Sequence, residues 1–245
     1  MKIARLGLDQ GPRYAVLDDE AGEFVLLADD PMFGSVTLTG TRMDAEQVRL
    51  VSPMIPRSKV IGFGGTYGRP TSLGELMVFL KPNTAVIGPD EPIILPGFTD
   101  SVEHEVEIAV VIGRVAKNAP VERAHEAIFG YTVANDVTAD SANIAMAKGF
   151  DTACPIGPFI VTDLDPAGLA LSSRVDRQPR RSGNTSDLAF SIPELVAYAS
   201  SIFTLLPGDV ILTGSPAGPG QIAPGQTVEV ECEGIGVLRN PVLRR

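Results

Sequence analysis

The sequence contains no tryptophan and only two cysteines and two histidines in 245 residues. Cys154 and Cys232 lie far apart and form no CxxC pair, so neither a disulfide framework nor a zinc ribbon is expected. Two idle thiols fit a reducing compartment, and a cytoplasmic location is the default expectation. His104 and His125 are the only histidines, and so small a number argues against a Ser-His-Asp or Cys-His mechanism.

Positive charge is also scarce, since 20 Lys and Arg stand against 30 Asp and Glu, for a net charge of -10. Phosphate binding needs clustered cations, so neither nucleic acid nor an anionic membrane surface is expected as a partner. No stretch approaches the 18 uninterrupted apolar residues of a membrane span, and MKIARLGLDQ lacks the apolar region of a secretory signal.

Aromatic residues make up only 6% of the chain, whereas Gly and Pro number 25 and 20. A core of Val, Ile, Leu and Ala with many turns favours short strands over a helix bundle. Residues 1–30 are short apolar runs separated by Gly, Pro and Asp, which is typical of hairpins. Two prolines, Pro53 and Pro56, end an irregular stretch before a new apolar strand. We therefore predict a small N-terminal β-rich domain at 1–55 and a larger domain at 56–245.

In the larger domain, runs of four to eight apolar residues ended by Gly, Pro or Asp predict many strands, among them VEIAVVIG, GYTVAND, DVILTG and TVEVECEG. Two helices are predicted between them, one at 120–130 and one in SIPELVAYASSIFTLLPG. The second begins with Ser191 and Glu194 in the spacing of a capping box. The predicted fold class is α+β and mainly β.

The segment VEHEVEI places Glu103, Glu105 and Glu107 at alternate positions of a predicted strand. Residues on one face of a strand lie about 7 Å apart, so three carboxylates would repel one another at the head of an apolar run. A hard divalent cation would relieve that repulsion. The same alternation recurs at 228–233, where a solvated sheet face explains it equally well, so the pattern alone leaves both interpretations open.

Asp136 and Lys148 are further candidates, the first at the end of an apolar strand and the second in a loop between two apolar runs. Asp136 ends the strand GYTVAND and fits either a ligand at a crevice or a turn. Lys148 is placed in a loop, MAKGFDTACPIGPF, where burial and a nearby cation would lower its pKa and suit it to proton transfer, although most loop lysines are simply solvated. The glycine-rich stretches 62–65 and 214–220 lack a phosphate-loop pattern and predict tight turns that could shape a cavity.

Several segments resemble the fumarylacetoacetate hydrolase family, in order over about 59–242: FLKPNTAVIG, HEVEIAVVIGR, GYTVANDVT, AKGFDTACPIGPFIVTD, SGNTSDLAFSIPELVAY, LLPGDVILTGSPAGPG and VEVECEGIGVLRNPV. Residues 1–55 resemble the small β domain that precedes this unit in many bacterial members. The resemblance implies a mixed β-sandwich roll, usually a homodimer, that binds Mg²⁺ or Mn²⁺ beside a small-molecule 2-oxo acid substrate.

Carried over by motif, the resemblance implies metal ligands at Glu105, Glu107 and Asp136, and leaves Glu103 outside the metal site. Lys148 matches the active-site lysine of the family. Two further positions, Thr185 in GNTS and Ser215 in TGSPAG, match residues that touch the substrate.

The chain departs from the family pattern around the proton-transfer apparatus. The usual NYxxHxxE lid segment, with its His and Glu, corresponds to a shorter GFGGTYGRPTSLGEL without histidine, and Asp140 and Asn143 stand where Arg and Gln are usual. Isomerisation or tautomerisation through a metal-stabilised enolate needs only proton relocation, so it is the predicted reaction, as in the related 2-hydroxyhepta-2,4-diene-1,7-dioate isomerases. Carbon-carbon bond hydrolysis or decarboxylation, and an inactive binding protein, remain the alternatives.

Overall fold

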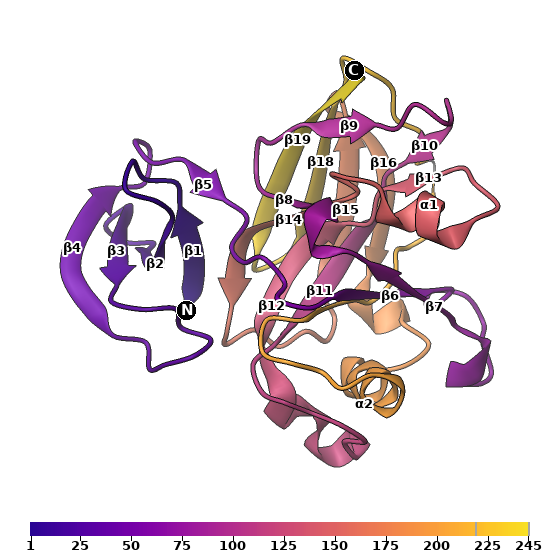
Figure 1. Cartoon of the computed structure of the whole chain (residues 1–245), viewed down its shortest axis with the longest axis horizontal. Coiled ribbons are helices and arrows are strands. Elements are labelled where there is room, and N and C mark those ends of the chain that lie inside the picture. The colour runs from indigo at the N-terminus through magenta and orange to yellow at the C-terminus, as the bar shows by residue number, and fades with distance from the viewer. Residues whose placement is uncertain (219, 245) are drawn as a thin grey trace.

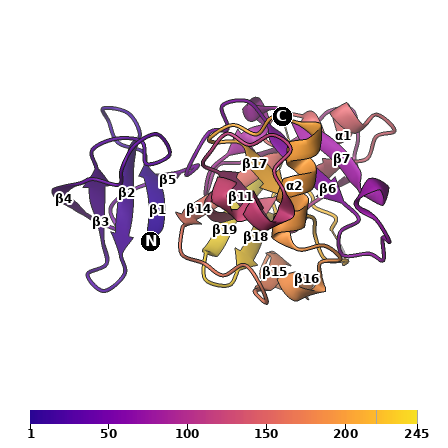
Figure 2. The same ribbon diagram turned by 90° about the horizontal axis from the view of Figure 1, so that it is seen from below.

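The computed structural model describes residues 1–218 and 220–244. The chain begins with β1 (Lys2–Leu6), β2 (Arg13–Asp18), β3 (Glu23–Leu27), β4 (Leu38–Asp44) and β5 (Leu50–Val51). These strands form a separate lobe in both views (Figures 1 and 2), with a small apolar cluster of their own that includes Leu6, Phe24 and Leu26. The boundary at residue 56 stays a prediction.

The remaining elements follow in chain order. They are β6 (Val60–Gly64), η1 (Leu73–Glu75), β7 (Met77–Lys81), η2 (Asn83–Ala85), β8 (Val86–Ile87), β9 (Ile93–Leu95), β10 (Val102–Glu103), β11 (Val106–Ile112), η3 (Val121–Ala127), β12 (Ile128–Asn135), β13 (Thr138–Ala139), α1 (Ile144–Gly149), β14 (Cys154–Val161), β15 (Ala170–Val175), β16 (Gln178–Asn184), η4 (Thr185–Asp187), α2 (Ile192–Ile202), β17 (Val210–Leu212), β18 (Thr227–Cys232) and β19 (Gly236–Arg244).

Two large mixed sheets carry the fold, which confirms the mainly β class. The first sheet has twelve strands along the path β4-β3-β2-β1-β14-β12-β11-β17-β6-β7, with β5 paired to β1 and β8 to β14. The second has five strands in the order β16-β15-β18-β19-β9, and β10 and β13 form a short ladder of their own. Antiparallel pairing of β1 with β14 joins the N-terminal strands to the rest of the first sheet.

The strand β11 is the centre of the core. All seven of its residues are buried, because β12 and β17 flank it within the sheet while β15 and β18 of the second sheet pack against it. A strand covered on both faces has no solvated side, which explains its uninterrupted apolar run after Glu107. The two sheets therefore enclose the main core between them.

The helices agree with the sequence in part. The helix α2 begins after Ser191, whose amide donates to Glu194 Oε2 at 2.7 Å, and Tyr198 of this helix stacks on Phe63 of β6 at 6.0 Å between ring centroids. The prediction of an ordinary helix at 120–130 is wrong. This segment contains the 3₁₀ helix η3, which has Pro120 at its N-cap and no side-chain hydrogen bond at the cap. In the described part of the chain, no helix is long and apolar enough to cross a membrane.

Candidate active site

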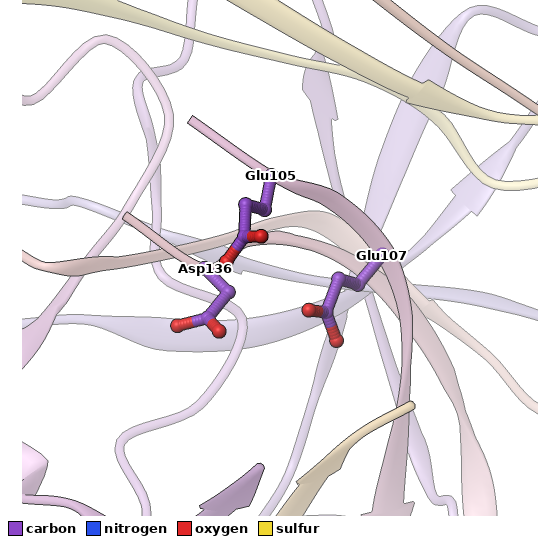
Figure 3. Close-up of side chains that lie close together, drawn as sticks. All are labelled: Glu105, Glu107 and Asp136. Carbon is purple, nitrogen blue, oxygen red and sulfur yellow. The ribbon is translucent and has the colours of Figure 1, made fainter. Parts of the chain in front are cut away.

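Three carboxylates converge at one end of the strand pair β11–β12. In this antiparallel pair Val106 lies opposite Asn135, and the Asp136 amide, just beyond β12, donates to the Glu105 carbonyl oxygen at 2.9 Å, so Glu105 lies opposite Asp136. Glu107 lies opposite Ala134 and therefore diagonally across from Asp136 on the same face. Glu105 directly precedes β11, and one oxygen from each of the three carboxylates lies within 4.8 Å of the other two. Figure 3 shows the three side chains gathered around one space. The residues predicted as metal ligands are thus brought together.

The continuous strand predicted for 103–107 is wrong, because β10 ends at Glu103 and β11 begins only at Val106. The interruption lies at His104, which is buried, with Nδ1 at 2.7 Å from the Gly220 carbonyl oxygen and Nε2 at 2.8 Å from Ser173 Oγ. Burial lowers the pKa of His104 to about 4. The chain turns here, so Glu103 faces Arg181 (3.3 Å) and stays outside the group of three carboxylates.

Lys148 lies at the end of the short helix α1, and its prediction as a loop residue is wrong. Asn143 caps the helix, because its Oδ1 accepts a hydrogen bond from the Ala145 amide at 3.0 Å. The ammonium of Lys148 donates to Glu105 Oε2 (2.7 Å), to Asp136 Oδ2 and to Thr138 Oγ1 (2.6 Å). Its Nζ also lies 4.6 Å from the centroid of the Phe79 ring.

The charges of the site shift the pKa of Lys148 in the direction opposite to the prediction. Burial alone lowers this pKa, but Asp136 and Glu105 outweigh burial, and the net shift is upward. Burial likewise acts to raise the pKa of Asp136, yet Lys81 and Lys148 outweigh it and the pKa is lowered. Asp136 and Lys148 thus stabilise each other in their charged forms.

A second lysine, Lys81 of β7, was missed by the sequence reasoning. Its side chain is 0% exposed, and Nζ lies 2.6 Å from Asp136 Oδ1. It also donates to the carbonyl oxygens of Val137 (2.9 Å) and Ala153 (2.7 Å). The sequence does carry a signal for Lys81, because this lysine ends an apolar strand directly before a proline. A lysine that is buried in such a place usually has a charged partner.

Of the three carboxylates, Glu107 is the one without an ion-pair partner in the described ranges. It is buried and accepts a hydrogen bond from the Gly214 amide at 2.6 Å. Gly214 has φ +95, and a Cβ there would lie 1.9 Å from Thr66 Oγ1, so this turn requires glycine. Burial, together with the charges of Asp136 and Glu105, raises the pKa of Glu107 well above its ordinary value.

This donor set fits a hard divalent cation. Asp136 pairs with Lys81 and Lys148, and Glu105 pairs with Lys148 and Arg181. Glu107 has no ion-pair partner among the described residues, and the ligand atoms are all oxygens. Asp136 Oδ1, although 2.6 Å from Lys81 Nζ, accepts no well-directed hydrogen bond. A buried carboxylate without an ion-pair partner, Glu107, and an Asp136 oxygen without a well-directed hydrogen bond are the features that a bound Mg²⁺ or Mn²⁺ would resolve.

A cavity of about 490 Å³ opens beside these groups. Ser215 lies on its wall, and its Oγ accepts from Arg181 Nη1 at 3.4 Å. Thr185 is not among the lining residues, and its hydroxyl donates to the Pro166 carbonyl oxygen (2.7 Å) and accepts from the Leu169 amide (2.8 Å). The substrate-binding roles of Ser215 and Thr185 stay predictions.

Comparison with known proteins gives the family. A family model described as the C-terminal part of fumarylacetoacetate (FAA) hydrolase matches residues 66–243. The chain belongs to the fumarylacetoacetate hydrolase family. A second model, described as Rv2993c-like N-terminal, matches residues 1–53. The resemblance found in the sequence is therefore confirmed.

Solved structures of relatives agree over the full length. The 5-carboxymethyl-2-hydroxymuconate delta-isomerase from Mycobacterium smegmatis is 44% identical with a TM-score of 0.93, and 100% of both chains is covered. The 2-hydroxyhepta-2,4-diene-1,7-dioate isomerase from Mycobacterium marinum is 40% identical with a TM-score of 0.92 and covers 100% of this chain and 99% of that one. The maleylpyruvate hydrolase from Sphingobium sp. SYK-6, solved in complex with manganese (II) ion and pyruvate, is 30% identical with a TM-score of 0.85, with 100% and 99% covered.

Among curated relatives, the oxaloacetate tautomerase FAHD2A of Bos taurus is 33% identical over 273 residues, which are 97% of this chain and 87% of that protein. Taken with the isomerase structures, this relative favours an isomerase over a hydrolase. The chain is an enzyme of the fumarylacetoacetate hydrolase superfamily.

Proposed function

We propose that the protein is a divalent-cation-dependent isomerase or tautomerase of 2-oxo acids. The observation that carries the proposal is the position of Lys148 Nζ, 2.7 Å from Glu105 Oε2, on the wall of the cavity and beside the three converging carboxylates. Glu105, Glu107 and Asp136 would hold the cation, with Mg²⁺ preferred and Mn²⁺ as the alternative. When bound, the cation supplies a Lewis acid for a substrate oxygen that gains negative charge.

The chain's own side chains supply the remaining chemistry. Lys148 holds a proton at Nζ and faces the cavity, so it can deliver that proton to C3 of a substrate enolate, and the neutral amine that results can take a proton from C3 in the reverse direction. Lys81 keeps Asp136 ionised and in place from the opposite side. Phe79, buried beside Lys148, excludes water from the ammonium and so strengthens its interactions.

Proton relocation is favoured over bond cleavage because cleavage also requires a base that activates water. Within the described residues, no histidine lines the cavity: His104 is held in a buried hydrogen-bond pair, and His125 is exposed on η3. The isomerase and tautomerase names of several relatives support this choice. The substrates in those names have more than one carboxylate. From these relatives we infer only the type of reaction for this chain, and not the substrate.

Hydrolysis of an acylpyruvate is the second candidate, supported by the maleylpyruvate hydrolase that shares the fold at 30% identity. Decarboxylation remains a further possibility within the same superfamily. In both cases the cation and Lys148 would act at the same end of the substrate.

Deuterium exchange tests the proposal. The protein is incubated with Mg²⁺ and 2-oxopentanoate in D₂O, and loss of the C3 proton signal is followed by NMR. We expect exchange that stops with EDTA and is reduced at least about a hundredfold by Lys148→Met, in line with the loss of a general acid-base group. Exchange that survives both treatments would contradict the assignment.

Two further properties stay proposals. A homodimer is expected, and light scattering that gives a mass near 25.9 kDa at all micromolar concentrations would contradict it. A cytoplasmic location is expected from the absence of disulfides and is tested by fractionation of the producing cells.

A further inference from the structure

Arg181 of β16 lies just behind the cavity wall, between a predicted metal ligand and Ser215. Only 6% of its side chain is exposed, and Arg181 does not itself line the cavity. Its Nη1 lies 3.7 Å from Glu105 Oε1 and donates to Ser215 Oγ at 3.4 Å, while Nη2 lies 3.3 Å from Glu103 Oε2. One buried cation thus contacts both the metal side and the substrate side of the cavity.

The position of Arg181 is fixed by contacts that involve no carboxylate. Its amide donates to Ser173 Oγ at 3.1 Å, and the same oxygen lies 2.8 Å from His104 Nε2. His104 Nδ1 in turn lies 2.7 Å from the Gly220 carbonyl oxygen. A Cβ at Gly220 would lie 2.4 Å from Arg181 Nη2, so the backbone approaches the guanidinium as closely as only glycine allows. Arg181 therefore keeps its place when Glu105 is engaged elsewhere.

At Glu105, the guanidinium competes with a divalent cation. Glu105 Oε1 faces Arg181, and Glu105 Oε2 accepts from Lys148 at 2.7 Å. A cation that binds Glu105 must share this carboxylate with both positive charges. Arginine stays protonated in proteins, so loss of a proton cannot relieve its repulsion. Removal of the guanidinium should therefore strengthen cation binding.

At Ser215, the same guanidinium favours the substrate. Arg181 Nη1 donates to Ser215 Oγ and also to the Pro216 carbonyl oxygen at 3.2 Å. The Pro216 oxygen lies 3.3 Å from Ser215 Oγ, which is long for a hydroxyl donor. The hydroxyl proton of Ser215 is thus left for an oxygen in the cavity, and the adjacent positive charge strengthens a hydrogen bond to an anionic acceptor.

We infer that Arg181 is a positioning residue that acts through Ser215 to favour the anionic head group of the substrate, and that it weakens cation binding at Glu105. This inference rests on the proposed function and on the predicted substrate contact of Ser215. It predicts changes of opposite sign when the guanidinium is removed, because the cation should bind more tightly and the substrate more weakly. A residue that only supported the fold would weaken both on removal.

Titration of the metal-stripped protein with Mn²⁺ measures the first change. Arg181→Met should lower the Kd about 3- to 10-fold, whereas Arg181→Lys, which keeps the charge, should stay within about twofold of the wild type. Arg180→Met is the matched control and should leave the Kd unchanged, because Arg180 precedes Arg181 on β16, is exposed and does not line the cavity. Arg181→Gln, which keeps a hydrogen-bond donor, gives the same test if Arg181→Met does not fold.

Exchange at C3 of 2-oxopentanoate, at saturating Mg²⁺, measures the second change. Arg181→Met should raise KM about tenfold and change kcat by less than about threefold, because Ser215 contacts the head group alike in the ground state and the transition state. Arg181→Lys should give an intermediate KM, and Arg180→Met the wild-type value. In a Ser215→Ala background, Arg181→Met should alter KM by less than about twofold, since the residue through which it acts is gone.

Calorimetry of the Mg²⁺-loaded protein with 2-oxopentanoate gives a readout that does not depend on turnover, and Arg181→Met should bind this acid about tenfold more weakly. Weaker Mn²⁺ binding by Arg181→Met, an unchanged affinity for the acid, or a full effect of Arg181→Met in the Ser215→Ala background overturns the inference. If the wild type shows no exchange, the proposed function fails, and the two titrations still decide the role of Arg181.

Discussion

Replacing Lys148 with methionine should strengthen the binding of a divalent cation while it removes activity. The ammonium of Lys148 is bonded to Glu105 Oε2 and Asp136 Oδ2, two of the oxygens that a cation would take. A cation bound there must displace the ammonium or tolerate its repulsion. Methionine keeps the length and apolar character of the side chain and removes the competing charge.

The size of this effect follows from charges in a partly dehydrated site. Unit charges 4 Å apart interact by about 4 kcal/mol at an effective dielectric constant of about 20, and withdrawal of the lysine side chain relieves much of that repulsion. We therefore expect a net gain of about 1.4 to 2.8 kcal/mol, which is about 10- to 100-fold in Kd.

Isothermal titration of metal-stripped protein with Mn²⁺ and Mg²⁺ measures this gain directly. Lys148→Arg, which keeps the charge, should stay close to the wild type, and so should Lys117→Met, because Lys117 is exposed, donates to the Ser201 and Ile202 carbonyl oxygens and does not line the cavity. Equal or weaker cation binding by Lys148→Met would refute the reasoning, because Lys148 would then support the metal site instead of competing with the cation.

Three further predictions concern the ligands, the buried lysine and the thiols. Glu107→Gln should weaken Mn²⁺ binding at least about tenfold, whereas Glu229→Gln, the same change on the half-buried strand β18, should not. Equal effects of the two changes in calorimetry would contradict Glu107 as a metal ligand. Lys81→Met should cost up to about 3 kcal/mol of stability in thermal or urea unfolding because buried Asp136 then keeps Lys148 alone as its ion-pair partner, and an unchanged melting temperature would contradict this role. Burial raises the pKa of Cys154 and Cys232 to about 12, so both thiols should resist Ellman's reagent at pH 8 until the protein is unfolded, and rapid reaction in the native state would oppose their burial.

Local patterns predicted the strands and α2 well, because their signals lie within a few neighbouring residues. The apolar run after Glu107 and the capping box at Ser191 each specify an element without reference to the rest of the chain. The convergence of Glu107 with Asp136 needed one further step, the antiparallel pairing of β11 with β12.

The contacts that tune the site were beyond such patterns. Lys81 reaches Asp136 across 55 positions of sequence, and Arg181 approaches Glu103 from β16, in a hairpin that the sequence reasoning did not predict. The direction of the pKa shift of Lys148 depends on which carboxylates surround it, and only the packing of α1 against β7 and β13 fixes that. Sequence spacing carries no information about these neighbours.

The most direct test of the central claim compares two rates in one sample. The Mg²⁺-loaded protein is incubated in D₂O with an acylpyruvate, and NMR follows deuterium entry at C3 and release of the product acids together. We expect deuterium entry to exceed cleavage by about 10² or more, because no histidine that could activate water lines the cavity in the described part of the chain, and we expect Lys148→Met to remove the exchange. Cleavage as fast as exchange, retained in Lys148→Met, would contradict it.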